Sequence, residues 1–147
     1  MFGWLAKILG AKKDNDSDVL SMSQIEIKRL MCNYDIVDNP AFIHIESARF
    51  IIPEYDAACR KVRTFDSGSL TYANNFRCVH FARKLAAYLA GTGWAVGLLT
   101  VDIGNGAYHE LVSVVVSVKG KPLVFYFDAQ TRGQYHKTFK ILWGDVA

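Results

Sequence analysis

One stretch of the sequence constrains the fold more than any other: between residues 74 and 129, a helical pattern is followed by three strand patterns. The helix is expected over residues 74–89, because apolar residues recur at helical spacing and Gly91 stops it. The strands are expected over residues 94–101, 108–118 and 123–129. Lys119–Gly120–Lys121 joins the last two as a hairpin. This order predicts an α+β domain in which the helix packs on a small antiparallel sheet.

The rest of the sequence predicts a single domain with a short N-terminal extension. A length of 147 residues suits one core, and 51% apolar residues against 21% charged residues argue against disorder. Residues 1–12 are expected to form an amphipathic helix, residues 13–20 a polar linker and residues 21–147 the domain itself. Within the domain, a helix is expected to begin at Ser21 with Ser21 and Gln24 as a capping box. Extended segments are expected over residues 43–45 and 49–52, and a further helix after Pro53.

Net charge and cysteine content argue against several classes of protein. The formal charge of +3 is mild, and the basic clusters lack the interleaved aromatic residues of a nucleic-acid groove, so nucleic acid is not an expected partner. The three cysteines, Cys32, Cys59 and Cys78, cannot all pair, and no Cys-x-x-Cys is present. We therefore expect no metal, no cofactor and a reducing, cytoplasmic location, with Cys32 and Cys59 in the core.

The N-terminal segment carries an apolar stripe at helical spacing. The stripe consists of Met1, Trp4, Leu5, Ile8 and Leu9. Such a stripe suits docking on the domain or on a partner protein, and it also suits a membrane surface. Docking is favoured because basic residues around the stripe are sparse.

Three residues suggest chemistry. Cys78 lies in the first turn of the predicted helix, where free backbone amides and the helix dipole favour a thiolate. His109 begins a strand from which an imidazole can face a helix end, and Asp128 ends the next strand, where a carboxylate can orient that imidazole. Strand alternation puts His109 and Asp128 on one face, but a hairpin register pairing Val118 with Leu123 leaves them about 13 Å apart. On that register, a bulge or wider loop is needed to bring them together, and a tight, unbulged turn at Gly120 means that Asp128 is misassigned.

Three short motifs resemble the core of papain-like thiol hydrolases: residues 75–82 around Cys78, 106–112 around His109 and 125–131 around Asp128. The likeness spans about residues 72–133 and is greatest to the cysteine-protease domain of fungal agglutinins, with NlpC/P60 and CHAP amidases as looser relatives. It implies a papain-like or NlpC-like fold.

The same resemblance implies roles for single residues. Cys78 would be the nucleophile, His109 the general acid and base, and Asp128 the orienting group of a Cys–His–Asp triad. Gln130 matches a supporting glutamine. No glutamine precedes Cys78 where papain-like enzymes place an oxyanion donor, so Asn74 or Asn75 would supply it together with the Cys78 N–H.

Two functions follow as hypotheses. The first is a cysteine peptidase or cell-wall peptide amidase that hydrolyses an amide of a peptide or protein substrate through an acyl-enzyme on Cys78. The alternative is a non-catalytic papain-like scaffold that acts as an intracellular protein-binding or inhibitory module through residues 20–65 or the N-terminal helix. A third hypothesis is peripheral membrane association through residues 1–9.

Overall fold

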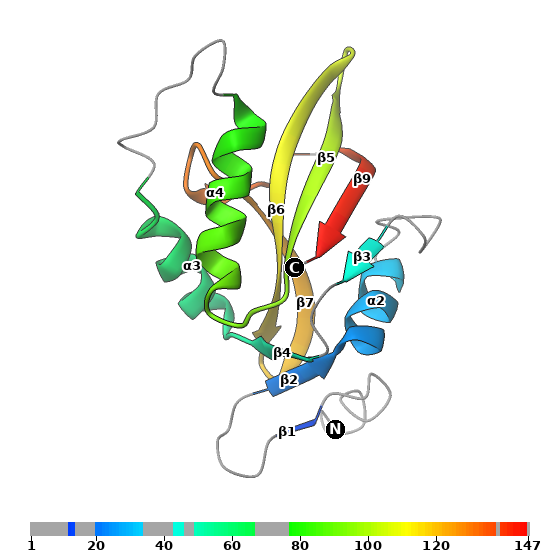
Figure 1. Cartoon of the computed structure of the whole chain (residues 1–147), viewed down its shortest axis with the longest axis vertical. Coiled ribbons are helices and arrows are strands. Elements are labelled where there is room, and N and C mark those ends of the chain that lie inside the picture. The colour runs from blue at the N-terminus through cyan, green and yellow to red at the C-terminus, as the bar shows by residue number, and fades with distance from the viewer. Residues whose placement is uncertain are drawn as a thin grey trace.

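Strands outnumber helices in the computed structural model, which describes residues 12–13, 20–33, 43–45, 49–66, 77–137 and 139–146 (Figure 1). The helices in this part of the chain are α2 (Gln24–Asn33), α3 (Tyr55–Arg63) and α4 (Cys78–Ala90). The larger sheet consists, in spatial order, of β3 (Ile43–Ile45), β9 (Lys140–Val146), β5 (Val96–Gly104), β6 (Ala107–Val118), β7 (Lys121–Asp128) and β8 (Gly133–Gln134). The smaller sheet consists of β1 (Lys12–Lys13), β2 (Leu20–Ser23) and β4 (Arg49–Ile52).

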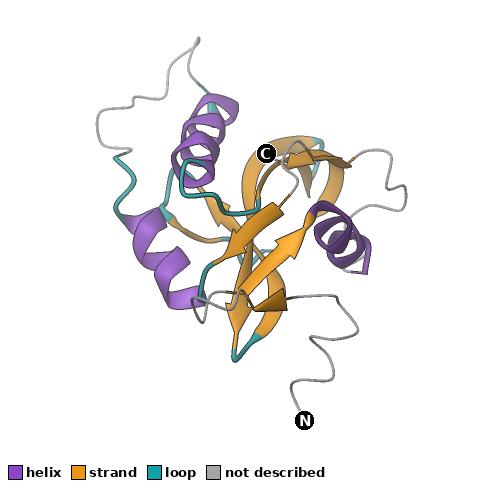
Figure 2. Ribbon diagram, turned by 60° about the horizontal axis from the view of Figure 1, so that its bottom comes forward, coloured by secondary structure: helices purple, strands orange, loops and turns teal. Residues whose placement is uncertain are grey.

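The long hairpin of β5 and β6 forms the centre of the larger sheet. β7 continues it on one side and β9 on the other, all antiparallel, whereas β3 pairs with β9 in parallel. Every residue from Leu111 to Ser117 is buried, because elements cover this sheet on both faces. Figure 2 shows two helices on one side of the strands and the third on the other.

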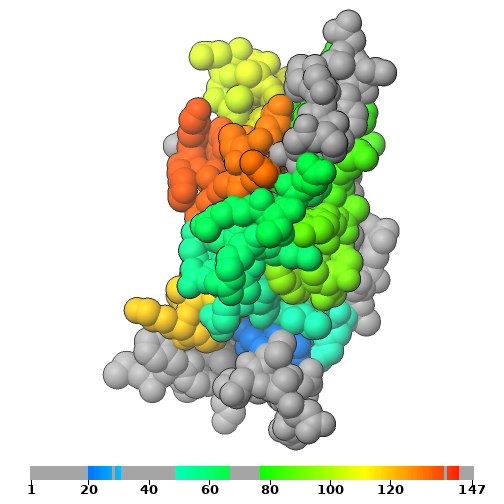
Figure 3. All heavy atoms as spheres, turned by 90° about the vertical axis from the view of Figure 1, so that its left-hand side faces the viewer, coloured from blue at the N-terminus to red at the C-terminus, as the bar shows by residue number. Residues whose placement is uncertain are grey.

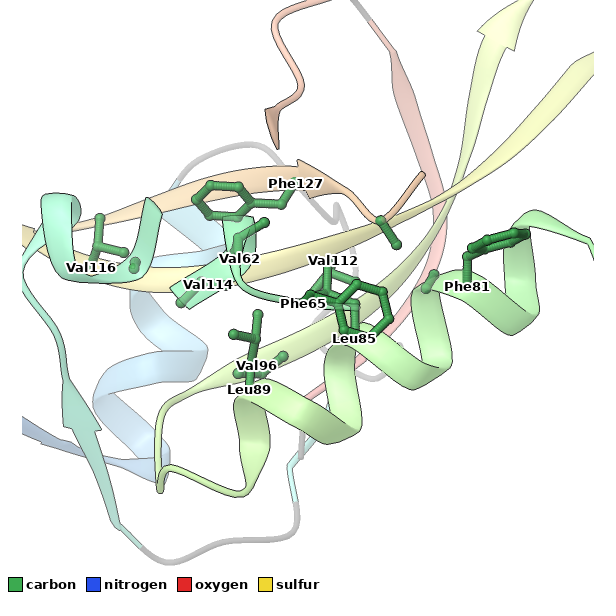
Figure 4. Packing of buried hydrophobic residues seen from close by; sticks show 13 residues of the cluster. Val62, Phe65, Phe81, Leu85, Leu89, Val96, Val112, Val114, Val116 and Phe127 are labelled. Carbon is green, nitrogen blue, oxygen red and sulfur yellow. The ribbon is translucent and has the colours of Figure 1, made fainter. Parts of the chain in front are cut away.

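One face of the sheet packs against α3 and α4. Helical spacing turns the apolar residues of α4 toward even-numbered residues of β6, and Leu85 and Leu89 are fully buried there. Figure 4 shows this cluster, whose labelled members are Val62, Phe65, Phe81, Leu85, Leu89, Val96, Val112, Val114, Val116 and Phe127. Fully burying one leucine side chain contributes about 1.5–3 kcal/mol, so this layer supplies much of the stability.

The opposite face of the sheet carries odd-numbered residues of β6. Val115 packs with residues of α2 and the smaller sheet, among them Met22, Ile27 and Phe50. Nearer the hairpin end, Leu111 packs with Leu99, Val101, Tyr126 and the aromatic residues Tyr135 and Phe139. The α4 helix and these aromatic residues therefore lie on different faces of one sheet.

The turn between β6 and β7 has two residues. Lys119 and Gly120 both have positive φ, at 52° and 77°, as a tight hairpin turn requires. Val118 consequently pairs with Lys121, not with Leu123 as the sequence predicted. This shift of register moves every residue of β7 relative to β6.

Several predicted elements are confirmed with changed boundaries. The helix expected over residues 74–89 is observed at Cys78–Ala90, and the helix expected after Pro53 is α3. The helix expected at Ser21 begins at Gln24, because residues Leu20–Ser23 form β2 and the reciprocal capping contacts join Ser23 to Glu26. Residues 1–9, with their apolar stripe, lie outside the described residues.

The papain-like or NlpC-like fold class predicted from the sequence is wrong. The sequence placed α4 against a small antiparallel sheet, whereas the structure has a six-stranded mixed sheet and a second sheet. The segments over residues 43–45 and 49–52 were predicted as extended and form β3 and β4, whereas the strands β2, β8 and β9 were not predicted. Within the described residues, no helix is long and apolar enough to cross a membrane.

Candidate functional site

His109 and Asp128 form a half-buried pair at the hairpin end of the larger sheet. The His109 Nε2 lies 3.1 Å from Asp128 Oδ2, and the exposed fractions of the two side chains are 15% and 13%. The other carboxylate oxygen, Oδ1, accepts the backbone N–H of Gln130 at 2.8 Å. The His109 ring also lies 6.1 Å from the ring of Tyr135. The carboxylate therefore links β6 to the turn that follows β7.

The electrostatics of this pair favour an ionised carboxylate. Burial by itself raises the pKa of Asp128, because it removes water from the charged form. Hydrogen bonds from His109 and from the Gln130 N–H oppose burial, and together with the charge of the imidazole they bring the pKa below its usual value of 3.8. Asp128 is therefore ionised in the folded protein at neutral pH.

The contact between His109 and Asp128 corrects one step of the sequence argument. A tight turn was expected to hold the two residues about 13 Å apart. The observed register, Val112 with Phe127, places Asp128 next to Leu111, only two residues from His109 on the same face. The unbulged turn therefore brings the pair together.

Cys78 lies on the other side of the sheet. It begins α4 and, by helical spacing, shares a face with Phe81, Ala82 and Leu85, which pack on the sheet. The thiol is free and half-buried. His109 belongs to the odd-numbered set of β6 that includes Leu111, and this set faces away from α4.

The acidic residue of β6 on the α4 face is Glu110. Its Oε1 accepts a hydrogen bond of 2.7 Å from Thr100 Oγ1, and its buried Oε2 has no hydrogen-bond partner among the described residues. At the start of α4, His80 Nδ1 accepts the Arg77 N–H at 2.9 Å, which ties that imidazole to the helix end. Because His109 faces away from α4, the sheet lies between Cys78 and the imidazole that was predicted to pair with it.

The remaining predicted site residues are Gln130, Asn74 and Asn75. The Gln130 side chain is exposed, and its contribution to the pair is its backbone N–H. Asn74 and Asn75 lie outside the described residues. Their supporting roles stay predictions.

A polar pocket of about 200 Å³ lies between α3 and the turn after β7. It is lined by Tyr55, Cys59, Arg63, Phe127, Arg132, Gly133, Gln134 and His136. Figure 3 shows the green α3 beside the orange segment that follows β7 on this side of the molecule. The first three lining residues are spaced i, i+4 and i+8, so one face of α3 forms a wall. This pocket was not predicted from the sequence, although the spacing of Tyr55, Cys59 and Arg63 is visible there.

A hydrogen bond joins the two walls of the pocket. Tyr55 Oη donates to Gln134 Oε1 at 2.7 Å, and the Tyr55 ring packs against Phe125 at a centroid distance of 4.7 Å. Two main effects raise the pKa of Tyr55 above 10.0: the larger is a side-chain hydrogen bond with Cys59, and the smaller is burial. The phenol therefore remains protonated and can donate a hydrogen bond. Cys59, expected in the core, is half-buried and lines this pocket.

The chain is similar to known proteins in its fold but not in its sequence. No protein-family model and no curated protein matches the sequence. Among solved structures, a PSL1a–E64 complex is similar with a TM-score of 0.66 and 14% identity, over 85% of this chain and 50% of the other. Polyporus squamosus lectin bound to the human-type influenza-binding epitope Neu5Acα2-6Galβ1-4GlcNAc is similar with a TM-score of 0.65 and 14% identity, over 91% of this chain and 54% of the other.

The chain shares its fold with part of a fungal lectin. It spans about half the length of each of these structures. The predicted likeness to fungal agglutinins holds at this level, and its cysteine-protease part gains no support. The predicted thiol hydrolase is contradicted, because the solved structures of similar fold are of a lectin. The roles of Cys78, His109 and Asp128 stay predictions: His109 contacts Asp128, whereas Cys78 belongs to the face of α4 that packs on the opposite side of the sheet.

Proposed function

We propose that this chain is a non-catalytic binding domain whose ligand is a carbohydrate. The observation that carries the proposal is the polar pocket between α3 and β8, whose walls present a phenol, an amide and guanidinium groups. The lectin of similar fold is bound to a sialylated trisaccharide, and this supports the ligand class.

The groups in the pocket suit a sugar. Sugar hydroxyls both donate and accept hydrogen bonds, and the Gln134 amide and the Tyr55 hydroxyl can do the same. Phe127, which is almost fully buried, closes the pocket on the side of the hydrophobic core. A volume of about 200 Å³ is below the usual range for drug-sized ligands, so one sugar unit would enter and the rest of a glycan would lie on the surface.

A glycan-binding assay on the full chain tests this proposal. Calorimetry with Neu5Acα2-6Galβ1-4GlcNAc and a panel of neutral and acidic glycans should detect binding of at least one. Gln134→Ala should weaken that binding by roughly 2- to 10-fold, the value of one hydrogen bond. Gln130→Ala is the matched control, because Gln130 is exposed and does not line the pocket.

The proposal fails if no glycan of the panel binds, or if Gln134→Ala and Gln130→Ala bind equally well. The alternative ligand class, a protein bound by residues 20–65 or by the N-terminal helix, predicts the first of these results.

A further inference from the structure

We infer that the ligand unit in the pocket between α3 and β8 carries a carboxylate, as an acidic sugar does. The inference rests on the proposed function and deepens it. Arg63 and Arg132 line the pocket together with His136, and the described lining residues include neither Asp nor Glu. A small site with two guanidinium groups and no carboxylate of its own is matched by an anion.

The two arginines come from opposite walls. Arg63 ends the face of α3 that begins with Tyr55, and Arg132 lies in the turn between β7 and β8. The one ion pair observed between described residues, His109 with Asp128, involves neither guanidinium. Both side chains are exposed, so they can reach a ligand from the two sides of the pocket without first breaking an internal ion pair.

Arg63 alone would not justify the inference. Basic residues are favoured in the last turn of a helix, and Arg60 and Lys61 accompany Arg63 there. Helix stability therefore accounts for Arg63 without a ligand.

Arg132 has no such explanation. Its φ is 56°, in the left-handed region where asparagine or glycine costs less conformational free energy. The bond from its N–H to the Asp128 carbonyl, at 2.9 Å, holds this conformation. The turn is further held by the Asp128 carboxylate through the Gln130 N–H. The Arg132 side chain, held at this left-handed position of the turn, lines the pocket.

The test compares three ligands that differ in one sugar or one group: Neu5Acα2-6Galβ1-4GlcNAc, its carboxamide and Galβ1-4GlcNAc. The wild-type chain should bind the acid at least about tenfold more tightly than the carboxamide, since a paired charge is exchanged for a neutral amide. Added NaCl should weaken binding of the acid more than binding of the amide.

Two variants and a control assign the charge. Arg132→Asn removes the guanidinium and suits a left-handed backbone, so the fold should be kept while the preference for the acid is lost. Arg63→Gln should reduce the preference, and Arg83→Gln, at an exposed position of α4 outside the pocket, should leave it unchanged.

The outcomes separate this inference from the proposed function. Equal affinity for the acid and the carboxamide overturns the inference and leaves carbohydrate binding intact. Failure of all three ligands and of the wider panel overturns the proposed function itself. Inorganic phosphate that competes as strongly as the acid shows a site for any anion and overturns the assignment of a carboxylate.

Discussion

The substitution Asp128→Asn distinguishes a structural role of the His109–Asp128 pair from the catalytic role that the sequence suggested. The substitution keeps the size of the side chain and removes its charge. In the wild type, Oδ2 contacts the His109 ring and Oδ1 accepts the Gln130 N–H. An amide has a single acceptor oxygen, so it can serve one of these two groups as an acceptor.

The expected loss of stability is about 1–2 kcal/mol. A hydrogen bond to a charged group contributes about 1.5–3 kcal/mol and a neutral one about 0.5–1.5 kcal/mol. The expected loss of stability is the difference between these two ranges, because the introduced amide can still form a neutral hydrogen bond with the imidazole ring. For a domain of this size, about 1–2 kcal/mol lowers Tm by roughly 3–7 °C.

Thermal melts followed by circular dichroism at several pH values measure this effect. The pKa of Asp128 in the folded protein lies below the usual value of 3.8, so its stabilising contribution is fully present above that value. The contribution is lost as the pH falls through the folded pKa. The difference in Tm between wild type and Asp128→Asn should therefore be present above about pH 4 and shrink as the pH falls below that value. Asp102→Asn is the control, because Asp102 also accepts a backbone N–H, from Gly104, and has no hydrogen bond with a histidine among the described residues.

Alkylation of Cys78 by iodoacetamide, mapped by mass spectrometry, completes the test. Cys78 and Asp128 face opposite sides of the sheet, so Asp128→Asn should leave the rate of alkylation at neutral pH unchanged. A variant with wild-type Tm and slower alkylation of Cys78 would refute the reasoning, because it would couple the two residues across the sheet.

Further predictions concern the core, the turns and the pocket. Leu85→Ala should cost about 2–5 kcal/mol in urea denaturation, because Leu85 is fully buried between α4 and the sheet. Gly120→Ala should cost about 1 kcal/mol, because Gly120 has a φ of 77°, whereas Gly133→Ala should keep Tm, because a methyl group there has its nearest neighbour 3.8 Å away. Cys78→Ser should leave glycan affinity in calorimetry unchanged, because Cys78 does not line the pocket. Deletion of residues 1–11 should keep a cooperative melt, and liposome flotation of the two forms tests the predicted membrane contact.

Part of the candidate site could be predicted from the sequence. Alternation along β6 and β7 put His109 and Asp128 on one face, and the structure confirms this. Their distance was predicted wrongly, because a two-residue turn and a longer turn pair the two strands in different registers. Helical spacing located the helix that begins at Cys78, but it carried no information on which face of the sheet that helix covers.

The pocket was beyond sequence reasoning for a different reason. Tyr55 and Gln134, which close it with a hydrogen bond, are 79 residues apart. The spacing of Tyr55, Cys59 and Arg63 indicated a common face of a helix, and nothing local marked what that face would meet. The left-handed conformation of Arg132 is likewise imposed by the turn between two paired strands.

The sequence by itself determined the local elements: the α4 helix, the strands β5, β6 and β7 and the glycine-containing turns between them. These follow from backbone preferences and side-chain periodicity, which act over one or two turns of helix or a few residues of strand. Only the tertiary structure decided that His109 contacts Asp128 while Cys78 lies behind the sheet, and that α3 forms a pocket with β8. These arrangements depend on hairpin register and on the face that each helix covers, which are set by how the whole apolar surface is buried.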